Sequence, residues 1–118
     1  MKFLILEDCG ERIFNFKKRL GAHDLTFTDK PKEAIQLLQD SDWDYILLDH
    51  DMTPVFEQPG EGTGYEVAAW ISMHPERAPR HILIHTMNNI GAAAMMLVLG
   101  IAGLRASYKP LLWERIEI

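Results

Sequence analysis

Acidic side chains stand directly after two of the most apolar runs in the sequence. The run at residues 3–6 is followed by Glu7 and Asp8, and the run at residues 45–48 is followed by Asp49 and, two positions later, by Asp51. Crowded carboxylates repel one another, so one of them stays protonated unless a cation lies between them. Oxygen ligands that include one or two carboxylates suit Mg²⁺, which keeps several of its waters. We therefore expect a site for Mg²⁺ or another divalent cation; the alternative is that Glu7 or Asp8 caps the helix that follows.

Two histidines follow apolar runs as well. His50 lies between Asp49 and Asp51, and His85 follows the run at residues 81–84. Imidazole exchanges protons near neutral pH, and two opposed imidazoles beside Asp49 suit the acid–base cleavage of a phosphodiester. The alternative for each histidine is a structural role. Neighbours along a strand point to opposite faces, so if Asp49 and Asp51 both face a site, His50 faces away unless the chain turns there.

Three further polar residues near the ends of the later apolar runs are suited to an anion. The Thr86 hydroxyl can donate to a phosphoryl oxygen, and the Lys109 ammonium can neutralise one. Asn88 precedes a long segment rich in Ala and Met, and the amides at a helix N-terminus favour an anion. The alternative for Thr86 and Asn88 is that they cap this helix. For Lys109, a lone Lys-Pro pair such as Lys109-Pro110 is common, so the pair by itself is a weak signal for a phosphate site.

The elements that must position these residues alternate along the chain. Apolar runs predict strands at residues 3–6, 25–28, 45–48 and 81–84, with a weaker one near residues 107–108. Helical patterns occupy residues 11–20 and 31–39. A third helix is expected from residue 64, after a capping box of Thr63 and Glu66, and a fourth after Asn88 or Asn89. We expect residues 111–118 to form a short final helix or tail.

Strands that are apolar throughout are buried on both faces, as in a parallel sheet covered by helices. The predicted fold class is therefore α/β, with a doubly wound parallel sheet of four or five strands in three α/β/α layers. Ligands of such sheets bind outside the carboxyl ends of the strands, which is where the acids and histidines fall.

Length and charge limit the classes of function. A chain of 118 residues predicts a single domain over residues 1–118. A net charge of −5 argues against a coat on DNA or RNA and against binding to anionic membranes. Cys9 is the only cysteine, so no internal disulfide is expected. The longest uncharged apolar stretch, residues 90–104, is too short for a membrane span, and we expect a cytoplasmic protein with no membrane partner.

The order of these residues resembles the response-regulator receiver domain over nearly the whole chain. The matching residues are Glu7-Asp8 after the first strand, Asp49 after the third, Thr86 after the fourth and Lys109-Pro110 after the last. The resemblance implies the receiver (flavodoxin-like) fold with five strands, here with a short last helix. It also implies that the two acids bind Mg²⁺, that Asp49 accepts a phosphoryl group, and that Thr86 and Lys109 contact that group.

Two segments resemble a specific branch, the cyclic-phosphate-processing receiver-like domains of bacteria and their viruses. They are Leu48-Asp49-His50-Asp51 with residues 63–70, and Ile84-His85-Thr86-Met87-Asn88 with Gly91 and Met95. The branch carries extra histidines after the third and fourth strands, here His50 and His85. The resemblance implies a hydrolase, a metal-assisted phosphoesterase that processes cyclic or terminal phosphates on RNA or nucleotides. Two alternatives stay open: a stand-alone receiver phosphorylated on Asp49 that signals to a protein partner, and a non-catalytic interaction module.

Overall fold

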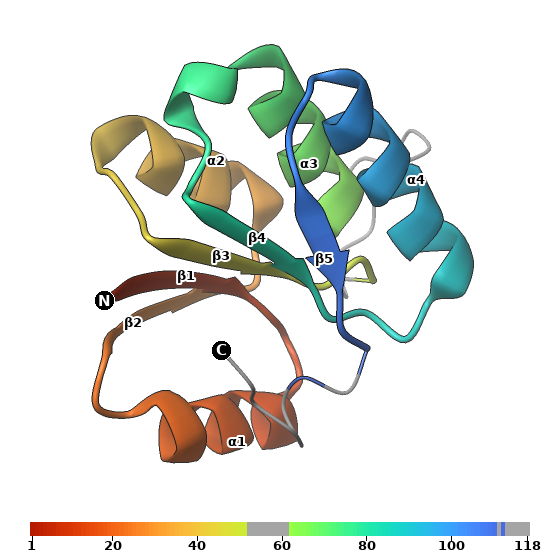
Figure 1. Ribbon diagram of the computed structural model, residues 1–118. Coiled ribbons are helices and arrows are strands. Elements are labelled where there is room, and N and C mark those ends of the chain that lie inside the picture. The colour runs from red at the N-terminus through yellow and green to blue at the C-terminus, as the bar shows by residue number, and fades with distance from the viewer. Residues whose placement is uncertain (52–61, 111, 113–118) are drawn as a thin grey trace.

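The computed structural model describes residues 1–51, 62–110 and 112. The strands are β1 (Lys2–Leu6), β2 (Asp24–Thr28), β3 (Tyr45–Leu48), β4 (His81–Ile84) and β5 (Ala106–Tyr108). They form one parallel sheet in the order β2-β1-β3-β4-β5 (Figure 1). The strand order reverses between β1 and β3, which is the doubly wound arrangement with its ligand-binding edge at the carboxyl ends.

Helices cover both faces of the sheet. They are α1 (Gly10–Leu20), α2 (Pro31–Asp40), α3 (Gly64–Met73) and α4 (Asn89–Ile101), with a short 3₁₀ turn at Pro75–Arg77. Figure 1 shows α1 on one face and α2, α3 and α4 on the other, so the three-layer α/β/α prediction is confirmed. The expected short last helix lies outside the described residues, apart from Leu112. Within the described part of the chain, no helix is long and apolar enough to cross a membrane.

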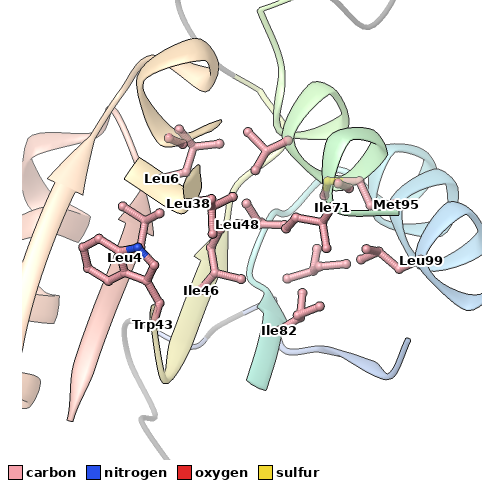
Figure 2. Close-up of a cluster of buried hydrophobic side chains, with 14 of the residues drawn as sticks. Leu4, Leu6, Leu38, Trp43, Ile46, Leu48, Ile71, Ile82, Met95 and Leu99 are labelled. Carbon is pink, nitrogen blue, oxygen red and sulfur yellow. The ribbon is translucent and has the colours of Figure 1, made fainter. Parts of the chain in front are cut away.

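Alternating side chains of the strands build two separate cores. Strand residues Leu4, Leu6, Ile46, Leu48, Ile82 and Ile84 pack against α2, α3 and α4, in the cluster drawn in Figure 2. The strand residues between them, such as Ile5, Leu47 and Leu83, pack against Phe16 of α1 in a second cluster. The central strands are thus buried on both faces, as their continuous apolar sequences predict.

The start of α3 differs from the predicted capping box. Thr63 occupies the N-cap position but makes no side-chain cap hydrogen bond. The Gly64 amide instead donates to the carbonyl oxygen of His50 at 2.9 Å, so the end of β3 satisfies a free amide of the helix. A Cβ on Gly64 would stand 1.7 Å from the carbonyl oxygen of Asp49, so this approach requires glycine.

The strand register aligns the carboxyl ends of four strands. Leu6 pairs with Leu48, Leu48 with Ile84, and Ile84 with Tyr108. The residues that come next in the chain therefore form one row along the sheet edge: Glu7, Asp49, His85 and Lys109.

Candidate functional site

Glu7, the first residue after β1, is buried and held by several partners. Its Oε2 accepts hydrogen bonds from the amides of Asp8 and Cys9, at 3.1 and 3.2 Å. Its Oε1 lies 3.0 Å from His85 Nε2, and both side chains are fully buried. Burial by itself raises the pKa of Glu7, but the hydrogen bond and charge of His85, with smaller effects from Cys9 and Arg12, bring this pKa below its ordinary value.

Asp49, the first residue after β3, carries a strongly shifted carboxyl. Its Oδ1 accepts the amide of His50 at 2.8 Å, and the residue is 3% exposed. Burial and the nearby negative charge of Glu7 raise the pKa of Asp49 to about 6, even though His85 acts in the opposite direction. A buried carboxyl with this pKa takes up and releases protons near neutrality, which is unusual for an aspartate.

Glu7, Asp49 and His85 form one group on the α1 side of the sheet. Each presents a ligand atom, and these atoms all lie within 4.8 Å of one another. The His85 ring packs edge-on against Phe16 of α1, with 5.2 Å between the ring centroids. The two carboxylates fit a divalent cation, because a cation relieves the repulsion that raises the pKa of Asp49. The imidazole nitrogen adds a ligand that suits transition metals better than Mg²⁺.

Arg12 is a member of this site that the sequence reasoning missed. Its Nη1 lies 3.8 Å from Glu7 Oε1 and 3.5 Å from Asp49 Oδ2, and its side chain is 26% exposed. A positive side chain in the first turn of α1 opposes the helix dipole. That local conflict was the available signal that Arg12 has acidic partners at the carboxyl end of the strands.

The remaining predicted cation ligands stand outside the group. Asp8 is half-buried and, with Glu7, lines a cavity of about 260 Å³ that also reaches Thr28 and Lys30 at the β2 side. Asp51 has an exposed side chain, and its Oδ1 lies 2.8 Å from His50 Nδ1. The hydrogen bond with His50 is the main reason that the pKa of Asp51 lies below its usual range. The structure therefore places Asp51 with His50 and apart from Glu7 and Asp49.

The two histidines reach the sheet edge from opposite sides. His85 continues the α1-facing alternation of β4, whereas His50 continues the alternation of Leu48, which faces the other helices. A Cβ on Gly91 would lie 2.4 Å from His50 Cγ, so the His50 ring packs directly on the first turn of α4. His85 therefore lies with the carboxylates, and His50 faces away from them. This is the outcome expected from the alternation of side chains along a strand, because Asp49, the neighbour of His50, faces the carboxylate group.

Thr86, Asn88 and Lys109 lie on the rim of the same edge. The buried Thr86 accepts the Asn88 amide on its Oγ1 at 3.1 Å. Asn88 is the N-cap of α4 and accepts the Gly91 amide at 2.9 Å, so the capping alternative is confirmed for this residue. The Lys109 amide donates to the carbonyl oxygen of Ile84 at 2.7 Å, which holds the end of β5 beside the end of β4.

A strand order of β2-β1-β3-β4-β5 with buried acids after β1 and β3 is the arrangement of a receiver domain of the response-regulator superfamily, and the family comparison agrees. The family model described as "Cyclic-phosphate processing Receiver domain" matches residues 3–100, and the chain belongs to this family. No curated protein matches the chain significantly.

Solved receiver structures share the fold at low sequence identity. The phosphorylated cyanobacterial phytochrome response regulator RcpA has a TM-score of 0.70 and 18% identity, over 92% of this chain and 79% of that one. The signal receiver domain of a protein described as a LuxO repressor, from Vibrio parahaemolyticus, has a TM-score of 0.68 and 21% identity, over 97% and 82%. The response regulator TrrA of Thermotoga maritima, solved in complex with Mg²⁺-BeF, has a TM-score of 0.64 and 18% identity, over 92% and 86%.

Proposed function

We propose that this receiver domain is a hydrolase, a metal-assisted phosphoesterase that processes cyclic or terminal phosphates on RNA or nucleotides. The observation that carries the proposal is the buried imidazole of His85, 3.0 Å from Glu7 and grouped with Asp49. Carboxylates alone suffice to hold a cation, whereas an imidazole in the same group adds a proton carrier. The description of the family, cyclic-phosphate processing, supports the same assignment.

The proposed reaction uses the two sides of the sheet edge. Water adds to phosphorus, and the bond from phosphorus to one ribose oxygen of the cyclic ester breaks, which leaves a phosphomonoester. His50, whose side chain is 18% exposed, takes the proton from the water and gives a proton to the departing ribose oxygen, while the fully buried His85 acts through its contact with Glu7. Glu7 holds His85 in place, and Thr86 and Lys109 stand at the sheet edge where the phosphate binds.

Glu7 and Asp49 are the proposed cation ligands of the described group, with Asp8 at the adjoining cavity. A divalent cation, Mg²⁺ or another, supplies positive charge at the phosphate oxygens when bound. This charge is needed here, because Glu7, Asp8 and Glu33 line the cavity and repel a phosphate. In the cation-free protein, Arg12 contributes positive charge beside Glu7 and Asp49.

The test is turnover of 2′,3′-cyclic nucleotides with Mg²⁺ or Mn²⁺, measured as phosphomonoester formed. We expect His50→Ala to lower kcat by roughly 10²-fold, the usual contribution of a general acid or base, and His85→Gln to lower it as well, because Glu7 loses its imidazole partner. His81→Ala is the matched control, because His81 is exposed at the opposite end of β4, and it keeps the wild-type rate. Turnover that survives the loss of both His50 and His85 contradicts the proposal.

A second candidate function is phosphorylation of Asp49 in a stand-alone receiver. The position of Asp49 at the carboxyl end of β3, with Lys109 following β5, favours it, and RcpA is a phosphorylated protein of the same fold. In this reaction an Asp49 oxygen bonds to phosphorus and the donor group leaves. Incubation with acetyl phosphate and Mg²⁺ followed by intact-mass measurement tests it: an adduct that Asp49→Asn abolishes supports it, and an unmodified wild-type mass excludes it.

A further inference from the structure

The His50 ring packs against the backbone of α4 at Gly91. Cγ, Cδ2 and Nδ1 of the ring would lie 2.4, 2.5 and 2.8 Å from a Cβ on Gly91. Contacts this short exclude any side chain at position 91 unless the ring moves. This packing therefore depends on glycine at position 91, and it fixes the plane of the imidazole against the first turn of the helix.

Two further side chains fix the rotation and the proton of this ring. Asp51 Oδ1 lies 2.8 Å from His50 Nδ1, and Asn88 Nδ2 donates to the same oxygen at 3.1 Å. The Asn88 carbonyl accepts the Gly91 amide, which orients the amide group so that its nitrogen faces Asp51. A carboxylate can only accept, so Nδ1 must carry the hydrogen in this contact. The side-chain nitrogen of Asn88 is also 3.4 Å from Nδ1, but both groups are then donors.

We propose that Asp51 and Asn88 are positioning residues that hold His50 in the tautomer with hydrogen on Nδ1 and a free lone pair on Nε2. The inference rests on the proposed function for its purpose, since Nε2 is then the atom ready to accept a proton at the sheet edge. It replaces the expectation that Asp51 binds the cation and that Asn88 binds phosphate. Thr86 extends the arrangement, because its Oγ1 accepts the backbone amide of Asn88.

The direct test is the tautomer, read from the ¹⁵N shifts of the imidazole nitrogens in labelled protein at alkaline pH. His50→Gln assigns the signals. We expect the wild type to show a protonated Nδ1 and an unprotonated Nε2. We expect Asp51→Ala to shift His50 towards the Nε2–H form, which free imidazole side chains prefer. Because the Asp51 side chain is 67% exposed, this variant keeps the fold.

Matched variants separate positioning from folding. Asp42→Ala removes another exposed acid of an ion pair, with Arg77, and leaves the His50 signals unchanged. Asn88→Ser retains a good N-cap for α4 but loses the donor to Asp51, so it weakens the tautomer preference without unfolding the helix. A wild-type His50 with its hydrogen on Nε2, or an Asp51→Ala protein with unchanged ¹⁵N shifts, overturns the inference.

Kinetics connect the tautomer to turnover and keep the two proposals apart. We expect Asp51→Ala to lower kcat for a 2′,3′-cyclic nucleotide by tenfold or more while KM stays unchanged, because the residue acts through His50 and does not touch the substrate. A correct tautomer in a wild-type protein without turnover supports the positioning and contradicts the phosphoesterase function. A normal kcat in Asp51→Ala with a changed tautomer overturns the positioning role.

Discussion

His85 Nε2 lies 3.0 Å from Glu7 Oε1, although the two residues are 78 positions apart in the chain. They follow β4 and β1, which are not neighbours, because β3 lies between them. The contact therefore passes across the end of β3, where Asp49 is buried. This explains why the three side chains form one group, and why the charge of Glu7 acts on the pKa of Asp49.

Loss of the His85 imidazole should destabilise the fold. We expect His85→Ala to lower the free energy of unfolding by about 3 kcal/mol, because it leaves the buried Glu7 carboxylate without its imidazole partner. The measurement is urea unfolding at pH 7 followed by circular dichroism. His81→Ala, which loses a ring stacked on Tyr45 at the protein surface, should cost less than about 1 kcal/mol. Equal losses in the two variants would show that the contact with Glu7 contributes nothing.

The raised pKa of Asp49 should appear as a pH dependence of stability. An acid whose pKa is about 6 in the fold and 3.8 in the unfolded chain binds more protons when folded, so its effect on stability becomes less favourable as pH rises through this window. The difference of about 2 pKa units corresponds to about 3 kcal/mol. We expect Asp49→Asn to be more stable than the wild type at pH 7, by up to this amount, and the gain to vanish near pH 4. Urea unfolding at a series of pH values measures it, and parallel pH profiles would contradict it.

A divalent cation should stabilise the protein through the same carboxylates. A ligand present at 100 times its Kd adds about 2.7 kcal/mol, or roughly 10 °C in Tm for a chain of this size. We expect Mn²⁺ or Mg²⁺ to raise the Tm of the wild type, and Glu7→Gln and Asp49→Asn to lose most of the rise. Asp42→Asn, at an exposed acid far from the carboxyl edge, should respond like the wild type. A Tm that is the same with and without cation in the wild type refutes a cation site.

Arg12 should compete with the cation. Its guanidinium lies 3.5 Å from Asp49 Oδ2 and offsets the negative charge that attracts a cation. We expect Arg12→Gln to bind Mn²⁺ about tenfold more tightly, which corresponds to about 1.4 kcal/mol. Titration calorimetry measures the affinity, and Arg19→Gln, an exposed position of the same helix, is the control. Weaker binding in Arg12→Gln would instead show that Arg12 helps to hold the carboxylates in place.

The order of the elements and the edge that carries the site could be predicted from the amino-acid sequence alone. Continuous apolar runs ending in Glu7, Asp49 and His85 require parallel strands buried on both faces, and the carboxyl ends of such strands must meet. The observed sheet confirms the predicted fold, and the matching family model confirms the family. One domain over residues 1–118, a cytoplasmic location and a protein or RNA partner stay predictions.

Which of these residues face one another depends on how the strands and helices pack. The register of β1, β3 and β4, together with the alternation of each strand, places Glu7, Asp49 and His85 on the α1 side and His50 on the α4 side. The spacing of Asp51 from Asp49 does not predict its position, because β3 ends at Leu48 and strand alternation no longer applies beyond it. The Asp51 Oδ1 instead lies 2.8 Å from His50 Nδ1. For Arg12 the only local signal was a positive charge in the first turn of α1, and its two partners are set by helix packing. For Gly91 nothing local shows that the helix backbone packs against an imidazole.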